Sequence, residues 1–272
     1  MNFSSFADMG IALLYFTGAL VFLAGVLGQN NALKRAASWI TVLGFCLHTL
    51  ALGLKTAVNP LETITQGHFY FSLLAWSLLL IYLILWRRLR LQFMALTAAP
   101  LALILFTPSI LITTRPLSIP STLSTLWFGL HIGALFLSLA LLALGFGAGL
   151  FYLYMNRQLK DKKKPGRFRR DIPSLATFDK LNSLTVSIGF PFFTLGLLSG
   201  FIWAGFTWGE PFSWDPKELI SIFIWLIFAY LFHQRKAIGW KGRKPANLTI
   251  VIFLLCLASL MVNFFVPTHH GF

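Results

Sequence analysis

The sequence predicts an all-α fold: a polytopic integral membrane helical bundle of about eight transmembrane helices, with the N- and C-termini on the outer side. Three observations predict it: the composition, eight long apolar runs, and basic residues concentrated in alternate loops. Hydrophobic residues make up 57% of the 272 residues and charged residues 11%, whereas a soluble domain carries about 25% charged residues. The polar surface is therefore too small to cover a water-facing globule, and a mean hydropathy of +0.76 agrees.

Eight apolar runs are long enough to cross about 30 Å of hydrocarbon as helices. The first lacks a basic residue upstream, since MNFSSFADMG carries only Asp8, and we expect a retained helix rather than a cleaved signal peptide. No separate soluble domain fits between the runs, so residues 1–272 are expected to form a single membrane domain. The helices are expected near 9–28, 37–54, 69–86, 91–113, 127–156, 183–203, 218–235 and 247–266.

The positions of lysine and arginine predict the orientation. Four alternate loops, after the first, third, fifth and seventh runs, hold 19 of the 22 basic residues. Excess lysine and arginine in short loops marks the cytoplasmic side of a membrane. Topology thus accounts for the net charge of +14, and a nucleic-acid partner is not expected. The remaining basic residues are Lys55, Arg115 and Lys217.

The two cysteines, Cys46 and Cys256, both lie within predicted helices. The sequence contains neither a CxxC motif nor the CxxCH motif that attaches haem covalently. We therefore expect neither a thiol oxidoreductase nor a c-type cytochrome.

Two loops differ from simple connections. The cytoplasmic loop 157–182 contains KDKKKPGRFRRD, which enforces topology and could also contact anionic lipid or dock a partner. The outer loop 203–218 reads WAGFTWGEPFSWDPKE. A single tryptophan at an interface is ordinary anchoring, but five aromatic residues bordered by acids favour a platform for a planar, amphiphilic ligand. These residues are Trp203, Phe206, Trp208, Phe212 and Trp214, with Glu210, Asp215 and Glu218.

Three histidines are expected at the same outer face. His131 stands near the outer start of the fifth helix, and His269 and His270 follow the outer end of the eighth. Two imidazoles from opposite sides of an aromatic pocket are what bis-histidine ligation of haem iron requires. The alternative is that each is a polar interfacial side chain facing water.

The other histidines leave more than one interpretation open. His233 lies near the cytoplasmic end of the seventh helix and is either a snorkelling residue or a functional one. His48 lies deep in the second helix, where it faces a functional interior or is a neutral side chain hydrogen-bonded to a neighbouring helix. The two differ in height by about 10 Å, too far for simple axial ligation of one haem. His68 is expected to be interfacial.

The aromatic loop and the helix after it resemble the cytochrome c assembly proteins of the CcsA/ResC type, a haem-handling family with a tryptophan-rich WWD segment. That family's pattern is approximately WGxxWxWDPKE, followed by a helix ending in His-x-Arg. This chain reads WGEPFSWDPKE over residues 208–218, then His233-Gln-Arg235. Phe212 stands where the family usually has tryptophan, which keeps an aromatic surface but loses an indole N–H. The resemblance extends to LHIGALFLSLALLA around His131 and to VNFF and HHGF near the end, so region 125–272 is expected to handle haem.

The resemblance implies a role in c-type cytochrome biogenesis: delivering haem b to the outer face and promoting its thioether attachment to the CxxCH of apocytochrome c. His233 would be a membrane-embedded haem ligand whose opposite ligand comes from a CcsB/ResB-type partner. The bacterial cytoplasmic membrane is the expected location, with the thylakoid membrane second. No residue looks like a nucleophile, so synthase activity is implied by the resemblance alone. A haem exporter without ligase activity, a HemX-like regulator of tetrapyrrole synthesis and a small-solute transporter are the alternatives. The implied haem site consists of His131, His270 or His269, Trp208, Phe212, Trp214 and Asp215.

Overall fold

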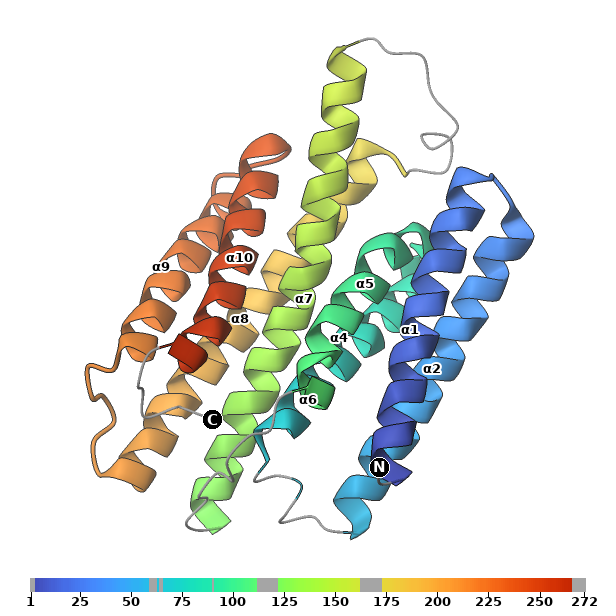
Figure 1. Cartoon of the computed structure of the whole chain (residues 1–272). Coiled ribbons are helices and arrows are strands. Elements are labelled where there is room, and N and C mark those ends of the chain that lie inside the picture. The colour runs from blue at the N-terminus through green and yellow to red at the C-terminus, as the bar shows by residue number, and fades with distance from the viewer. Residues whose placement is uncertain are drawn as a thin grey trace. The chain divides into compact units, whose positions relative to one another are not determined.

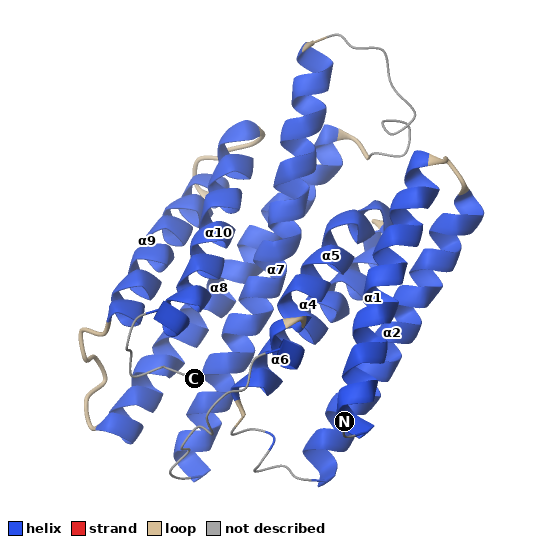
Figure 2. Ribbon diagram, viewed as in Figure 1, coloured by secondary structure: helices blue, strands red, loops and turns tan. Residues whose placement is uncertain are grey.

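The computed structural model describes residues 3–58, 63, 66–89, 91–111, 122–161 and 173–265. The described residues are helical apart from short connections (Figure 2). Eight helical segments are long and apolar enough to cross a membrane, which confirms the predicted fold class. They are Phe6–Leu27, Asn31–Val58, His68–Arg88, Gln92–Leu111, Leu126–Lys160, Leu175–Trp208, Pro216–Lys236 and Arg243–Leu260.

Two spans differ from the sequence prediction in ways that have a physical cause. The sixth helix begins at Leu175 rather than near 183, because polar Asp179 and Asn182 in its first turns are hydrogen-bonded within the protein. The fourth span is three short helices rather than one. Its last break precedes Pro108, whose ring removes a backbone N–H donor.

The chain separates into two compact units, and the single membrane domain expected over 1–272 stays a prediction. The first unit comprises residues 1–116 and 156–174, and the second comprises residues 117–155 and 175–272. The helices of the first unit are drawn in blue to green (Figure 1). They are α1 (Phe3–Leu27), α2 (Asn31–Val58), α4 (Gly67–Leu89), η1 (Gln92–Met94), α5 (Ala95–Phe106) and α6 (Pro108–Leu111).

In the first unit, α1 and α2 approach closely at two glycines. A Cβ atom at Gly18 would lie 2.7 Å from Thr41 Oγ1, and one at Gly44 would lie 2.9 Å from the Tyr15 ring. Small residues permit such close approach of membrane helices, whose association depends on packing and interhelical hydrogen bonds. Tyr15 is fully buried as a result.

The second unit is built from four long helices. Hydrogen bonds from Ser138 to Gly189 and from Asn182 to Gly145 show that the first two run antiparallel. The Trp225 Nε1–H donates to Thr194 Oγ1 at 2.9 Å and joins the second helix to the third. These helices are α7 (Thr122–Lys160), α8 (Leu175–Trp208), α9 (Pro216–Lys236) and α10 (Arg243–Phe265).

The antiparallel order places the aromatic loop and His131 at one end of the second unit. There α7 begins, α8 ends and α9 begins, while α10 runs back toward that end from the short turn that follows α9. The opposite end carries the basic segment 235–244. His269 and His270 lie outside the described residues, as do residues 162–172 of the predicted loop 157–182.

Candidate functional site

The connection from α8 to α9, residues 209–215, ends in a capped helix start. Asp215 is the N-cap of α9, and its Oδ1 accepts a hydrogen bond from the Lys217 backbone N–H at 2.8 Å. Pro216 occupies the first helical position, where its missing N–H would have had no helical partner. The Asp-Pro pair therefore sets the first turn of α9, and Asp215 is buried.

Glu218 ties the preceding residues to this turn. Its Oε2 accepts from the Ser213 backbone N–H at 2.9 Å, and its Oε1 accepts from Ser213 Oγ at 3.1 Å. Glu218 is buried like Asp215, whereas Glu210 is exposed. Two of the three acids expected to border an aromatic platform thus hold the backbone of the loop.

Trp214 lies between the residues held by these hydrogen bonds and points outward. Its side chain is 74% exposed, and its backbone has a φ of 59°. A bulky residue rarely adopts that left-handed conformation, which costs about 1–3 kcal/mol and tends to occur at ligand sites. Ser213 and Asp215 on either side are both hydrogen-bonded, so their contacts hold the strained residue in place.

A row of aromatic rings leads from Trp214 back to α8. Trp214 meets Phe212 edge-on, with ring centroids 5.0 Å apart, and Phe212 meets Phe201 edge-on at 5.9 Å. Edge-to-face pairs of this kind are favourable arrangements of aromatic quadrupoles. Phe212, which replaces the tryptophan expected from the resemblance, therefore retains an aromatic packing role.

His131 lies in a second aromatic group at this end of the unit. Its ring is nearly parallel to that of Trp203, with an interplanar angle of 14° and centroids 6.5 Å apart. Trp203 also contacts Phe128 at 5.0 Å and Trp208 at 5.1 Å. The structure therefore brings His131 and Trp208 to the same indole, which is itself buried.

One hydrogen bond determines the protonation of the His131 ring. Its Nδ1 lies 2.7 Å from the backbone carbonyl oxygen of Gly196. A carbonyl oxygen only accepts, so Nδ1 carries a proton and donates, and in the neutral form of the ring the lone pair is therefore on Nε2. Metal-bound histidines typically have this arrangement, because the second hydrogen bond fixes the tautomer and the ring orientation. The arrangement of the His131 ring matches that of histidines that bind a metal through Nε2.

The His131 ring packs against α8 where two glycines lie four residues apart. A Cβ atom at Gly200 would lie 2.5 Å from His131 Nδ1, and one at Gly196 would lie 2.7 Å from the Leu135 side chain. The absence of side chains lets α7 and the imidazole approach the α8 backbone. Neither glycine was predicted as a site residue, although Gly196-x-x-x-Gly200 is a GxxxG pattern that indicates close helix packing.

His233 and Arg235 lie at the other end of α9, with contrasting environments. His233 is exposed on the surface of the unit, whereas the Arg235 side chain is only 2% exposed. Arg235 forms an ion pair with Asp179 at 3.1 Å. From the sequence, Arg235 was recognisable as part of a motif, but its partner on α8 was not.

His48, in the first unit, is a hydrogen-bonded core residue. Its Nδ1 lies 2.9 Å from Tyr15 Oη, its Nε2 lies 2.8 Å from Ser72 Oγ, and its ring packs edge-on against Phe106 at 4.8 Å. Both nitrogens are engaged whichever one carries the proton. The structure thus favours the hydrogen-bonded interpretation over a ligand role.

Replacing His48 by leucine is therefore expected to lower stability without removing bound haem. The change leaves buried hydroxyls of Tyr15 and Ser72 without that partner, at a cost of about 1–3 kcal/mol. The measurement is the thermal unfolding midpoint in detergent, together with the haem absorption per folded protein. A lost haem signal in a folded His48→Leu protein would contradict the structural role.

A comparison with known families identifies the chain. The sequence profile described as cytochrome c assembly protein matches residues 67–270. That match includes His131, the aromatic loop and all of α9. The chain belongs to the cytochrome c assembly protein family.

Its relatives in this family are of the CcsA type, as the resemblance predicted. The cytochrome c biogenesis protein CcsA of Chlorella vulgaris is 34% identical, covering 72% of this chain and 74% of the relative. The CcsA protein of Pyropia yezoensis is 28% identical over 100% of this chain and 96% of the relative. Among solved structures, cytochrome c heme lyase CcmF shares the fold, with a TM-score of 0.66 at 14% identity. The likeness covers 93% of this chain and 45% of that one.

Proposed function

We propose that this cytochrome c assembly protein delivers haem b to the outer end of its second unit and promotes thioether attachment there to apocytochrome c. The observation that carries the proposal is the His131 ring, whose Nδ1–H is donated to Gly196 so that Nε2 is available for iron. The name of the structural neighbour CcmF, a heme lyase, supports haem as the cargo.

His131 supplies one axial ligand in this proposal, and His270 or His269 supplies the other. Low-spin haem with two axial imidazoles needs one histidine on each face of the porphyrin. The course of α10 toward the end of the unit that holds His131 supports this pairing, since the chain continues from Phe265 to the two histidines.

The aromatic loop holds the porphyrin near that site. Trp214 offers an indole that is 74% exposed and contacts Phe212, while Trp208 belongs to the aromatic group of Trp203 and His131 at the same end of the unit. A flat aromatic side chain suits the apolar face of a porphyrin. Asp215 contributes by capping α9, which keeps Trp214 in its outward position.

His233 receives haem at the cytoplasmic end of the same unit. Its exposure supports a ligand that is completed from outside the unit, by a partner of the CcsB/ResB type. The basic segment 235–244 beside it supports a cytoplasmic position for this end by the positive-inside rule, and so an outer position for the aromatic loop. In this proposal the membrane is the bacterial cytoplasmic membrane.

The covalent step in this proposal is an addition. The cysteine S–H adds across the haem vinyl double bond, so sulfur bonds to the carbon next to the ring and the proton goes to the terminal carbon. No group leaves and no net electrons are transferred. The protein contributes positioning, because holding two bulky reactants in attack geometry removes much of the entropic barrier.

The test is the absorption spectrum of the full chain purified in mild detergent with added haem b. His131→Ala is expected to reduce the low-spin signal by at least about 10-fold. Leu130→Ala, on the adjacent position of α7, removes an exposed side chain and serves as the control. A wild-type protein that binds no haem, even when co-expressed with its partner, would refute the proposal.

A further inference from the structure

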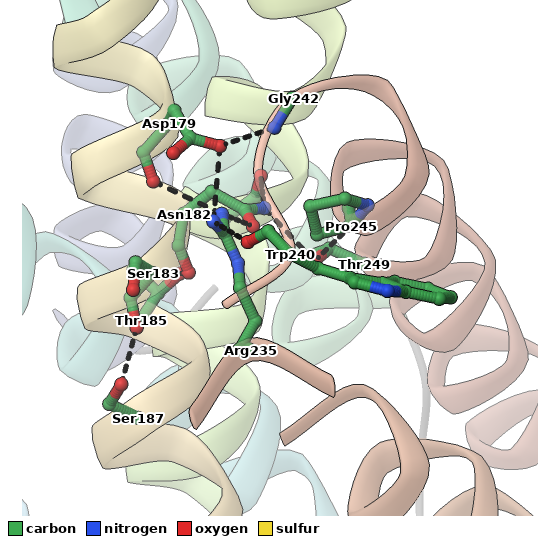
Figure 3. Close-up of polar contacts among 11 residues, drawn as sticks. Asp179, Asn182, Ser183, Thr185, Ser187, Arg235, Trp240, Gly242, Pro245 and Thr249 are labelled. Atoms are coloured by element: carbon green, nitrogen blue, oxygen red, sulfur yellow. Dashed lines mark hydrogen bonds and ion pairs between the residues drawn. The ribbon is translucent and has the colours of Figure 1, made fainter. Parts of the chain in front are cut away.

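A buried polar network joins the helices of the second unit at the end opposite the aromatic loop (Figure 3). The Arg235 guanidinium is at its centre. Its Nη1–H groups donate to Asp179 Oδ1 at 3.1 Å and to the Trp240 carbonyl at 3.0 Å. Its Nη2–H groups donate to the Asp179 carbonyl at 3.1 Å and to Asn182 Oδ1 at 2.6 Å. One side chain of α9 is thus fixed to α8 and to the turn before α10.

The partners of Arg235 are themselves held in place. Asp179 Oδ1 also accepts from the Gly242 backbone N–H at 2.8 Å. The Asn182 amide donates to Thr249 Oγ1 at 2.9 Å and reaches the Gly145 carbonyl at 3.4 Å. The network therefore includes residues of α7, α8, α9 and α10, and a shift of Arg235 would disturb all four.

Burying the Arg235 guanidinium, whose side chain is 2% exposed, carries a large desolvation penalty that its partners must offset. Well-packed apolar residues often stabilise a protein as well or better, so stability alone does not explain the network. An arginine also restricts the geometry of its contacts, because its planar guanidinium presents N–H donors in a rigid fork. Contacts to three residues at once determine how far α9 is rotated about its axis at this point.

That rotation decides where His233 points. Residues two apart on an α-helix project about 200° apart, since each residue turns the helix by about 100°. Arg235 turned into the unit therefore turns His233 out of it, and the structure shows the first buried and the second exposed. The helix continues without a break between them, because the Ala237 N–H donates to the His233 carbonyl at 2.8 Å.

We propose that Arg235 is the positioning residue of His233: its contacts with Asp179 and Asn182 fix the last turn of α9 so that His233 projects from the unit as a haem ligand. The inference rests on the proposed haem-binding role of His233. Arg235 does not touch the haem in this arrangement and acts only through the helix.

The test isolates the His233 signal by using a His131→Ala background. The full chain, in lipid nanodiscs with its partner co-expressed and haem b added, is compared with and without Arg235→Gln. The remaining low-spin signal is expected to fall by at least about 10-fold. Lys236→Gln is the matched control, because it removes an exposed charge from the next position of the same turn and is expected to change the signal less than about twofold.

A second comparison separates positioning from a general loss of structure. With His131 intact, Arg235→Gln should leave the His131-dependent signal per folded protein within about twofold, because the two sites lie at opposite ends of the unit. An equal loss at both sites would overturn the inference, and so would an unchanged His233 signal. If Arg235→Gln fails to fold, Arg235→Lys keeps the charge but loses the fork, and a wild-type His233 signal in that variant would also overturn it.

Failure of the underlying function is distinguishable in the same experiment. A His131→Ala protein with normal Arg235 that binds no haem would show that His233 is not a ligand. That result would overturn both the haem-binding role of His233 and the positioning role of Arg235. Haem bound in that protein and retained in Arg235→Gln would overturn the positioning role alone.

Discussion

Replacing Gly200 by alanine is expected to remove the haem signal that depends on His131. The new Cβ atom would lie 2.5 Å from His131 Nδ1 and 2.6 Å from its Cε1, so the ring must move and release the Gly196 carbonyl. Loss of such a supporting hydrogen bond typically lowers metal affinity by about 10- to 100-fold. The measurement is the low-spin absorption of the full chain titrated with haem b.

Gly133→Ala is the matched control for this substitution. It lies on the helix of His131, two residues away, and a Cβ atom there would meet no described atom within 4 Å. Alanine also favours a helix over glycine by about 1 kcal/mol, so neither change should weaken the helix itself. Wild-type haem affinity in Gly200→Ala would show that close packing of the His131 ring against Gly200 is not needed for ligation.

Replacing Trp214 by glycine is expected to abolish assembly of c-type cytochrome while leaving the protein about as stable as before. Glycine adopts a φ of 59° without strain, which recovers about 1–3 kcal/mol, and its greater freedom in the unfolded chain costs about 0.4–1 kcal/mol. The exposed indole, however, is lost with its ring contact to Phe212. The measurements are covalent haem in a co-expressed cytochrome c and the thermal unfolding midpoint in detergent.

Trp39→Ala provides the comparison, because Trp39 on α2 is 73% exposed and Trp214 is 74% exposed. If exposed tryptophans serve only to anchor the protein at the membrane interface, the two variants should lose assembly equally. We expect Trp39→Ala to keep assembly within about twofold and Trp214→Phe to retain a large part of it. Normal assembly in Trp214→Gly would remove the aromatic loop from the proposed mechanism.

The eight spans could be predicted because they depend on a local property. A helix must present about 20 apolar residues to cross hydrocarbon, and that requirement is visible in any window of the sequence. The start of the sixth helix, predicted near 183 but found at Leu175, was wrong because it depends on a property that is not local. Asp179 and Asn182 look like loop residues to a hydropathy scale, and only their pairing with Arg235, more than 50 positions away, lets the helix include them.

The candidate site was predictable in its residue types and in part of its geometry. The resemblance led to His131, Trp208, Phe212 and Trp214, and the antiparallel helices bring His131 and Trp208 to one indole. It did not show that Trp203 is that indole. It also did not show that Asp215, whose place in the haem site stays a prediction, is the buried N-cap of α9.

Two histidines show why the remaining assignments needed the folded protein. His48 and His131 both lie in apolar helices, and hydropathy alone does not distinguish a core histidine from a ligand at either position. Two hydroxyls from other helices occupy both nitrogens of His48, whereas one carbonyl binds His131 and leaves Nε2 a lone pair. Hydropathy is set along the chain and can be read from it. The protonation and direction of an imidazole are set by partners 24 to 65 residues away, which only tertiary contacts bring to it.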